Sequence, residues 1–87
     1  MKFKNLFVNH EMRFSLGFEQ ESGRYFVAIP VSNTLTDYEE YYEIDRTAFE
    51  RYSSNPSSAQ DFLSRCRNRE VDDLLILKPG RDRGWPW

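Results

Sequence analysis

The densest group of chemically active side chains is the segment Asp37–Asp45, which holds five carboxylates and three tyrosines in nine residues. Carboxylates attract basic groups, and tyrosine is enriched where proteins bind one another. The segment therefore has the chemistry of an acidic, aromatic docking face for a basic partner. The same composition also fits a solvated edge strand whose charges discourage edge-to-edge pairing and whose aromatic rings enter the core.

Alternation along an extended strand divides this segment between two faces. Ile44 faces inward if it packs against Phe49 in the first turns of a following helix. Tyr42 then also faces inward, whereas the odd-numbered residues face outward. The residues expected to contact a partner are Asp37, Glu39, Glu40, Tyr41 and Glu43.

A second candidate surface is basic and lies in the C-terminal part of the chain. Arginines and tryptophans are combined there, as they are on surfaces that bind single-stranded nucleic acid. The sequence pI of about 5.3 argues against that partner, and arginine late in a helix also has a structural role through the helix dipole. A nucleic-acid-binding accessory protein therefore stays an alternative to a protein-binding domain. The residues concerned are Arg65, Arg67, Arg69, Arg81, Arg83, Trp85 and Trp87.

The sequence offers no histidine- or cysteine-based group suited to catalysis or metal binding, and no pair of carboxylates stands out as the cleft pair that glycosidase-like chemistry would need. Nucleophilic catalysis needs a base beside the nucleophile, and the only histidine, His10, falls in an expected turn. Cys66 lies on the apolar stripe of a helix, where a free cysteine usually behaves as a small buried hydrophobe. One cysteine and one histidine are too few for a zinc site, and no glycine-rich phosphate loop is present. We expect a non-enzymatic protein without a cofactor.

The 87 residues predict a single domain, 1–87, with a modest core to which an aromatic content of 16% contributes strongly. Residues 1–45 carry four Lys or Arg against eight Asp or Glu, and residues 46–87 carry eight against six. The net charge of −2 points to no partner by itself. The single cysteine, the lack of a signal peptide and the lack of an apolar run of membrane-spanning length predict a cytoplasmic protein.

The central element is the alternating stretch Arg24–Ser32, which is expected to form a hairpin with Met12–Gln20. A two-residue turn at Ser22-Gly23 would place Phe18 opposite Val27, Leu16 opposite Ile29 and Phe14 opposite Val31. All of these side chains then share one face, which agrees with a buried sheet face.

The remaining elements follow from caps and periodicity. Phe3–Val8 is an expected strand, and Tyr38–Ile44 is a strand with helix as the alternative. Asp45 is the expected N-cap of a helix at Arg46–Tyr52, and a second helix begins at Ser57 with Gln60 at capping-box spacing. Its apolar stripe is Ala59, Phe62, Leu63 and Cys66.

The order of these elements predicts an α+β fold. We expect an antiparallel sheet of three to four strands, connected as a meander and packed against two short helices. Residues 1–45 are mainly strands and residues 46–70 hold the two helices. Residues 71–79 are a short apolar strand or extended segment, and residues 80–87 are a tail.

The segments Tyr41–Asp45, Phe49–Tyr52, Phe62–Cys66 and Leu74–Gly80, taken together, resemble the small immunity proteins of bacterial contact-dependent and other polymorphic toxin systems. The resemblance implies a stoichiometric inhibitor that occludes a toxin domain, often a basic nuclease. It assigns no binding residue, and the weak net charge departs from what tight electrostatic capture of a nuclease needs. A homo-oligomeric structural domain is a further alternative.

Overall fold

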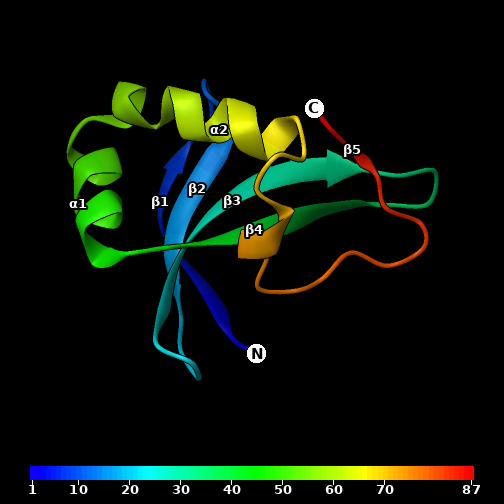
Figure 1. Cartoon of the computed structure of the whole chain (residues 1–87), viewed down its shortest axis with the longest axis horizontal. Helices are drawn as coiled ribbons and strands as arrows, with labels where there is room; N and C mark the ends of the chain where they lie inside the picture. Colours follow the sequence, from blue (N-terminus) through cyan, green and yellow to red (C-terminus); the bar gives the residue numbers. More distant parts are fainter.

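The computed structural model describes residues 1–87 and shows one antiparallel sheet with its helices on one face (Figure 1). The four long strands lie side by side in chain order, which confirms the expected meander and the α+β fold. The strands are β1 (Phe3–Asn9), β2 (Phe14–Glu19), β3 (Arg24–Ser32), β4 (Asp37–Ile44) and β5 (Trp85–Pro86). The helices are α1 (Arg46–Ser54), the 3-10 turn η1 (Pro56–Ala59), α2 (Gln60–Arg67) and the 3-10 turn η2 (Asp72–Leu74).

The hairpin of β2 and β3 keeps each side chain on its expected face, but its expected register is wrong by two residues. Leu16 lies opposite Val27 rather than Ile29. The cause is a longer loop than the expected two-residue turn. In this loop the Glu19 carboxylate accepts the backbone N–H of Ser22 at 2.7 Å, and Gly23 has a φ of 76°. Because the shift is an even number of residues, no side chain changes face.

The loop between β1 and β2 is built in the same way. The Asn9 side chain accepts the backbone N–H of Met12 at 2.8 Å, and Asn9 pairs with Phe14 across the hairpin. Arg13 occupies the position that Gly23 holds in the other loop, with a φ of 58°. Residues other than glycine seldom adopt this conformation. Because the loop takes up residues 10–13, the strand β2 begins at Phe14, later than expected.

The main core lies between α1, α2 and one face of the sheet. Leu16, Val27 and Ile29 are 0% exposed and pack in one cluster with Leu63 and Cys66 from α2. This confirms the shared buried face of the hairpin and the apolar stripe of the second helix. The opposite face of the sheet has no helix over it (Figure 1).

The helix starts differ in how well the sequence predicted them. Asp45 caps α1 as expected, because its carboxylate accepts the backbone N–H of Ala48 at 2.8 Å. The capping box expected at Ser57 does not form. Ser57 lies inside η1, its hydroxyl donates to the Asn55 side chain, and α2 begins only at Gln60.

The C-terminal segment covers the outer edge of β4 and then returns to β3 (Figure 1). Leu75 forms a single bridge to Tyr42, and the backbone N–H of Ile76 donates to Tyr41. Residues 71–79 thus contain η2 followed by an extended segment with a single bridge, and they form no regular strand. The tail ends in β5, whose Trp85 pairs with Ser32.

Candidate functional site

The helix-free face of the sheet carries most of the acidic residues that the sequence singled out. Asp37, Glu39, Tyr41 and Glu43 alternate along β4 on this face, opposite to the buried Tyr42. Asp37 and Glu43 are exposed, whereas Glu39 and Tyr41 are partly buried. The strand interpretation of this segment is confirmed, together with the inward position of Tyr42.

Tyr41 is held in place by two phenylalanines. Its ring stacks on Phe3 with centroids 3.8 Å apart and meets the edge of Phe26 at 4.9 Å. Burial, together with the nearby Glu39 carboxylate, raises the pKa of the Tyr41 hydroxyl above its usual value. The hydroxyl is therefore protonated at neutral pH and can donate a hydrogen bond from a rigid ring.

The carboxylates beside Tyr41 have only weak partners within the chain. Glu39 accepts the Ser15 hydroxyl at 3.3 Å. Glu43 lies 3.7 Å from the Arg24 guanidinium in a pair whose side chains are 50% and 43% exposed. Exposed pairs of this kind contribute little to stability because water competes for both charges. Both carboxylates can therefore interact with a partner.

Glu40 does not belong to the exposed face, although the sequence placed it among the partner-binding residues. Its side chain is 7% exposed, on the helix side of the sheet. Its carboxylate accepts two hydrogen bonds from the Arg83 guanidinium, at 2.8 and 3.1 Å, and one from the Tyr42 hydroxyl at 3.0 Å. This arrangement makes Glu40 a structural residue that fixes the tail.

A hollow of about 600 Å³ lies on the same helix-free face, next to the acidic stripe. Its floor is a cross-strand row in which Ser15, Ala28 and Tyr41 lie opposite one another on β2, β3 and β4. Val8 and Trp87, which also line it, are 49% and 51% exposed. The hollow thus combines apolar groups with carboxylates along its β4 side.

Sequence reasoning identified the acidic side of this hollow but missed its floor and its apolar lining. A usable signal was present, because Ser15, Gly17 and Ala28 are small residues at alternating positions of the helix-free face. Gly17 is required there, since an added Cβ would lie 2.4 Å from the Phe26 ring and still closer to a backbone oxygen. The position of Trp87 depends on the return of the tail, which no local pattern indicates.

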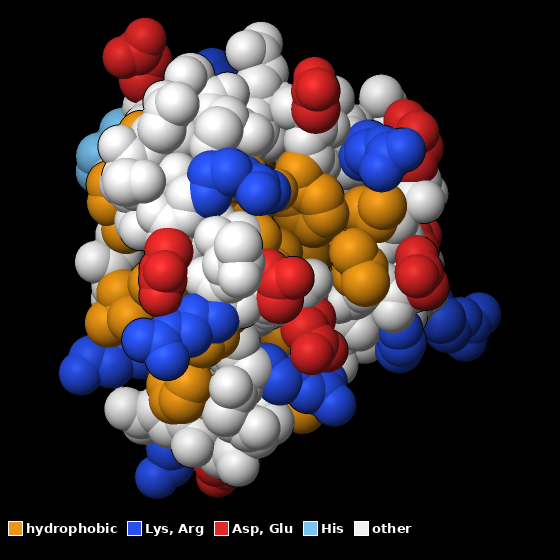
Figure 2. Space-filling view, turned by 60° about the vertical axis from the view of Figure 1, so that its left-hand side comes forward, with side chains coloured by type: hydrophobic (Ala, Val, Ile, Leu, Met, Phe, Trp, Pro, Cys, Tyr) orange, Lys and Arg blue, Asp and Glu red, His pale blue; other side chains and the backbone are white.

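Two of the five arginines of the second candidate surface, Arg69 and Arg83, hold the C-terminal segment in place. Arg83 is bonded to Glu40 and Asp72. Arg69 donates to the backbone carbonyl of Gly84 at 2.7 Å and stacks on the Trp85 ring at 3.8 Å. Figure 2 shows basic and acidic side chains interspersed on one side of the molecule, without a continuous basic field.

The groups considered for catalysis and metal binding lie apart from one another. His10 is exposed in the β1–β2 loop, and the structure holds no group of three or more His, Cys, Asp or Glu residues placed to bind a metal ion. Cys66 is 0% exposed, and burial raises the pKa of its thiol to about 12. None of the helices has the length and apolar character needed to cross a membrane.

Comparison of the chain with protein-family models, with curated proteins and with solved structures finds no match. The function is therefore inferred from the geometry of the helix-free face.

Proposed function

We propose that this chain is a non-enzymatic protein-binding domain that recognises a basic partner through the helix-free face of its sheet. The single observation that carries the proposal is the hollow of about 600 Å³, which joins exposed apolar groups to the carboxylates of Asp37 and Glu39. In its most concrete form, the domain is a bacterial immunity protein that binds and neutralises a toxin domain. We place this function in the cytoplasm, where a lone cysteine stays reduced.

The apolar part of the site supports a macromolecular partner. Tyr and Trp dominate the binding energy of many protein interfaces. Tyr41 is anchored by Phe3 and Phe26 before any partner arrives, so that little side-chain freedom is lost on binding. Val8 and Trp87 expose apolar area at the same hollow, which a partner would cover.

The charged part of the site supports a basic partner. Asp37, Glu39 and Glu43 lie along one strand, and only Glu43 forms an ion pair within the chain. Such a row of carboxylates speeds the encounter with lysine and arginine side chains. A basic toxin domain would supply these, and covering its surface is how a stoichiometric inhibitor acts.

The test is co-purification from the source cell with a charge-reversed site. The variant Glu39→Lys/Glu43→Lys is compared with the parent and with the control Glu50→Lys/Glu70→Lys, which makes the same charge change at exposed residues of the helical half. The proposal expects a protein that the parent and the control retain and that the site variant loses. Retention of the same proteins by all three would contradict it.

The toxin form of the proposal is tested with the protein identified in this way. Expressing that protein without this chain should arrest growth, and co-expression should restore it. If the partner proves harmless when expressed alone, the chain would still be a protein-binding domain, but the proposed immunity function would be wrong.

A further inference from the structure

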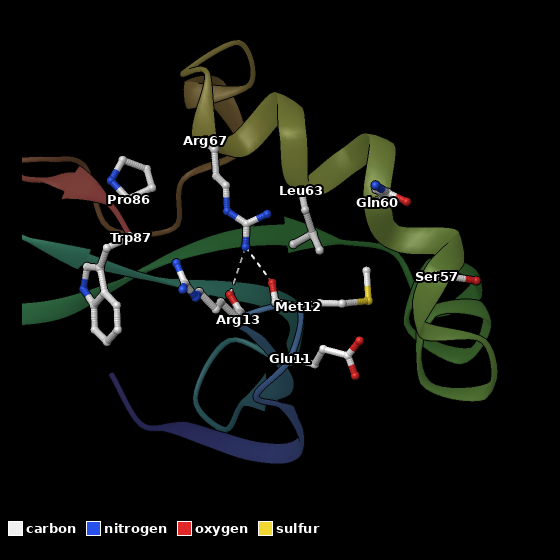
Figure 3. A pocket seen from close by; sticks show the side chains of 9 residues that line it. All are labelled: Glu11, Met12, Arg13, Ser57, Gln60, Leu63, Arg67, Pro86 and Trp87. Atoms are coloured by element: carbon white, nitrogen blue, oxygen red, sulfur yellow. Dashed lines mark hydrogen bonds between the residues drawn. The ribbon is translucent and has the colours of Figure 1, made fainter.

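A second hollow, of about 580 Å³, lies between α2 and the loop that joins β1 to β2 (Figure 3). Leu63 and Met12 supply an apolar wall. Arg13, Arg67 and Trp87 lie toward the other end, where the indole ring of Trp87 is 51% exposed. The volume is in the range of pockets that bind small molecules.

Arg67 is fixed in this hollow by the backbone of the loop. A single terminal nitrogen, Nη2, donates to the carbonyl of Met12 at 2.7 Å and to that of Arg13 at 3.2 Å. Nε and Nη1 of the same guanidinium have no acceptor within the chain. Figure 3 shows the second terminal nitrogen directed toward Leu63, along the hollow. The guanidinium is therefore held in one orientation before any ligand binds, and its Nε and Nη1 groups remain free to donate hydrogen bonds.

Arg13 brings a second positive charge close to the first. Neither arginine takes part in an ion pair, since the ion pairs of the molecule involve the N-terminus, Arg24, Arg46 and Arg83. Burial, and after it the charge of Arg13, lower the pKa of the Arg67 guanidinium. Glu11 also lines the hollow, but its carboxylate is directed away from both guanidiniums (Figure 3). Neither of these two like charges therefore has an ion-pair partner within the protein.

We propose that this hollow binds a phosphate monoester that carries a planar group, the chemical class to which mononucleotides belong. The dianionic phosphate matches the two guanidiniums of Arg13 and Arg67, and arginine binds phosphate oxygens through paired hydrogen bonds. The planar group stacks on the exposed indole of Trp87, as bases do on aromatic side chains. A carboxylate would neutralise only one of the two charges. This site shares Arg13 and Trp87 with the hollow of the proposed protein-binding face, but none of its lining residues belongs to the acidic stripe of β4.

The binding test uses the fluorescence of Trp87 in a Trp85→Phe background, in which it is the only tryptophan because the chain has two. The probes are adenosine 5′-monophosphate, adenosine and inorganic phosphate. The monophosphate should give a saturable change, with an affinity roughly tenfold or more above that of either fragment, because only it engages both the guanidiniums and the indole.

Arg13→Asn removes one charge and keeps the backbone conformation, since asparagine tolerates a positive φ. Its matched control is Arg65→Asn, at an exposed arginine of α2 outside this hollow. The first variant should weaken binding of the monophosphate roughly tenfold or more, and the second should leave it unchanged. A melting curve for each variant confirms that both are folded.

Three outcomes would overturn the proposal. The first is the absence of saturable binding of the monophosphate to the folded parent at millimolar concentration. The second is equal weakening by Arg13→Asn and Arg65→Asn, which would mean non-specific attraction by net charge. The third is binding of indole-3-acetate as tight as that of the monophosphate, which would make this a carboxylate site.

Discussion

The guanidinium of Arg83 is bonded to the carboxylate of Glu40 across a sequence separation of 43 residues, with Nε to Oε2 at 2.8 Å. The two side chains are 12% and 7% exposed, so the pair lies almost entirely out of water. Arg83 also donates to both carboxylate oxygens of Asp72, at 2.7 and 2.9 Å. Through these bonds the tail is fixed to β4 and η2, which sets the position from which β5 and Trp87 reach the hollows.

Replacing Arg83 should lower the free energy of unfolding. Removing the charge of Glu40 as well should restore much of that free energy. Arg83→Met leaves Glu40 buried without a counter-charge, which typically lowers the free energy of unfolding by about 3–5 kcal/mol. The double variant Glu40→Gln/Arg83→Met removes that buried charge. Urea unfolding of both variants measures the difference. Equal destabilisation by the single and the double variant would show that the ion pair is not what fixes the tail.

Glu19 should make stability depend on pH on the acid side. Hydrogen bonds from the Ser22 side chain and from the backbone N–H groups of Lys2, Glu21 and Ser22 lower its pKa from 4.5 to about 2. Because the folded pKa is the lower one, the stabilisation is complete above the unfolded value near 4.5 and is lost as the pH falls toward 2.

The variant Glu19→Gln should therefore be less stable at neutral pH and should lose stability less steeply between about pH 5 and 2 than the parent does. Denaturant unfolding at a series of pH values measures this slope, with Glu11→Gln at an exposed loop position as the control. A slope for Glu19→Gln that matches the parent would contradict the role assigned to its carboxylate.

Cys66 should react with a thiol reagent only when the protein opens. Its side chain is 0% exposed and burial raises the pKa of the thiol to about 12, so that little thiolate forms near pH 8. Labelling should be slow in the native protein and fast in denaturant. Native labelling as fast as that of the unfolded chain would mean that the face of α2 carrying Leu63 and Cys66 is not buried.

Substitutions at the neighbouring residues Leu16 and Ser15 test which face of the sheet is packed in the main core. Leu16→Ala should lower the free energy of unfolding by about 2–5 kcal/mol, because it leaves a cavity in the main core. Ser15→Thr should cost little, since its side chain faces the hollow on the other side of the sheet. Thermal or urea unfolding measures both changes. Similar costs at the two positions would be incompatible with the observed faces.

Local patterns predicted the elements of this fold well. Period-two alternation placed Leu16, Val27 and Ile29 on one buried face, and Asp45 was correctly identified as a helix cap. The hairpin register could not be predicted from Gly23 alone, because the loop is closed by the Glu19 side chain. The matching loop at Arg13 has no glycine, so its positive φ leaves no signal in the sequence.

The candidate site was predictable only along β4, where alternation separates Glu39, Tyr41 and Glu43 from Tyr42. Glu40 shares the inward side with Tyr42, and its partner is Arg83 from the tail. A buried glutamate of this kind cannot be recognised until its counter-charge is located. The same long-range return of the tail positions Trp87, which lines both hollows.

The measurement that tests the central claim most directly is the association rate of the co-purified partner at two salt concentrations. If the helix-free face is the binding surface, Glu39→Lys/Glu43→Lys should slow association and flatten its salt dependence, because the attraction to a basic partner is removed. Its melting temperature should stay close to that of the parent, since Glu43 is exposed and Glu39 accepts only one long hydrogen bond, from Ser15. The control Glu50→Lys/Glu70→Lys should change the association rate much less at either salt concentration. Association of the site variant as fast as that of the parent would show that the acidic strand is only a solvated part of the sheet.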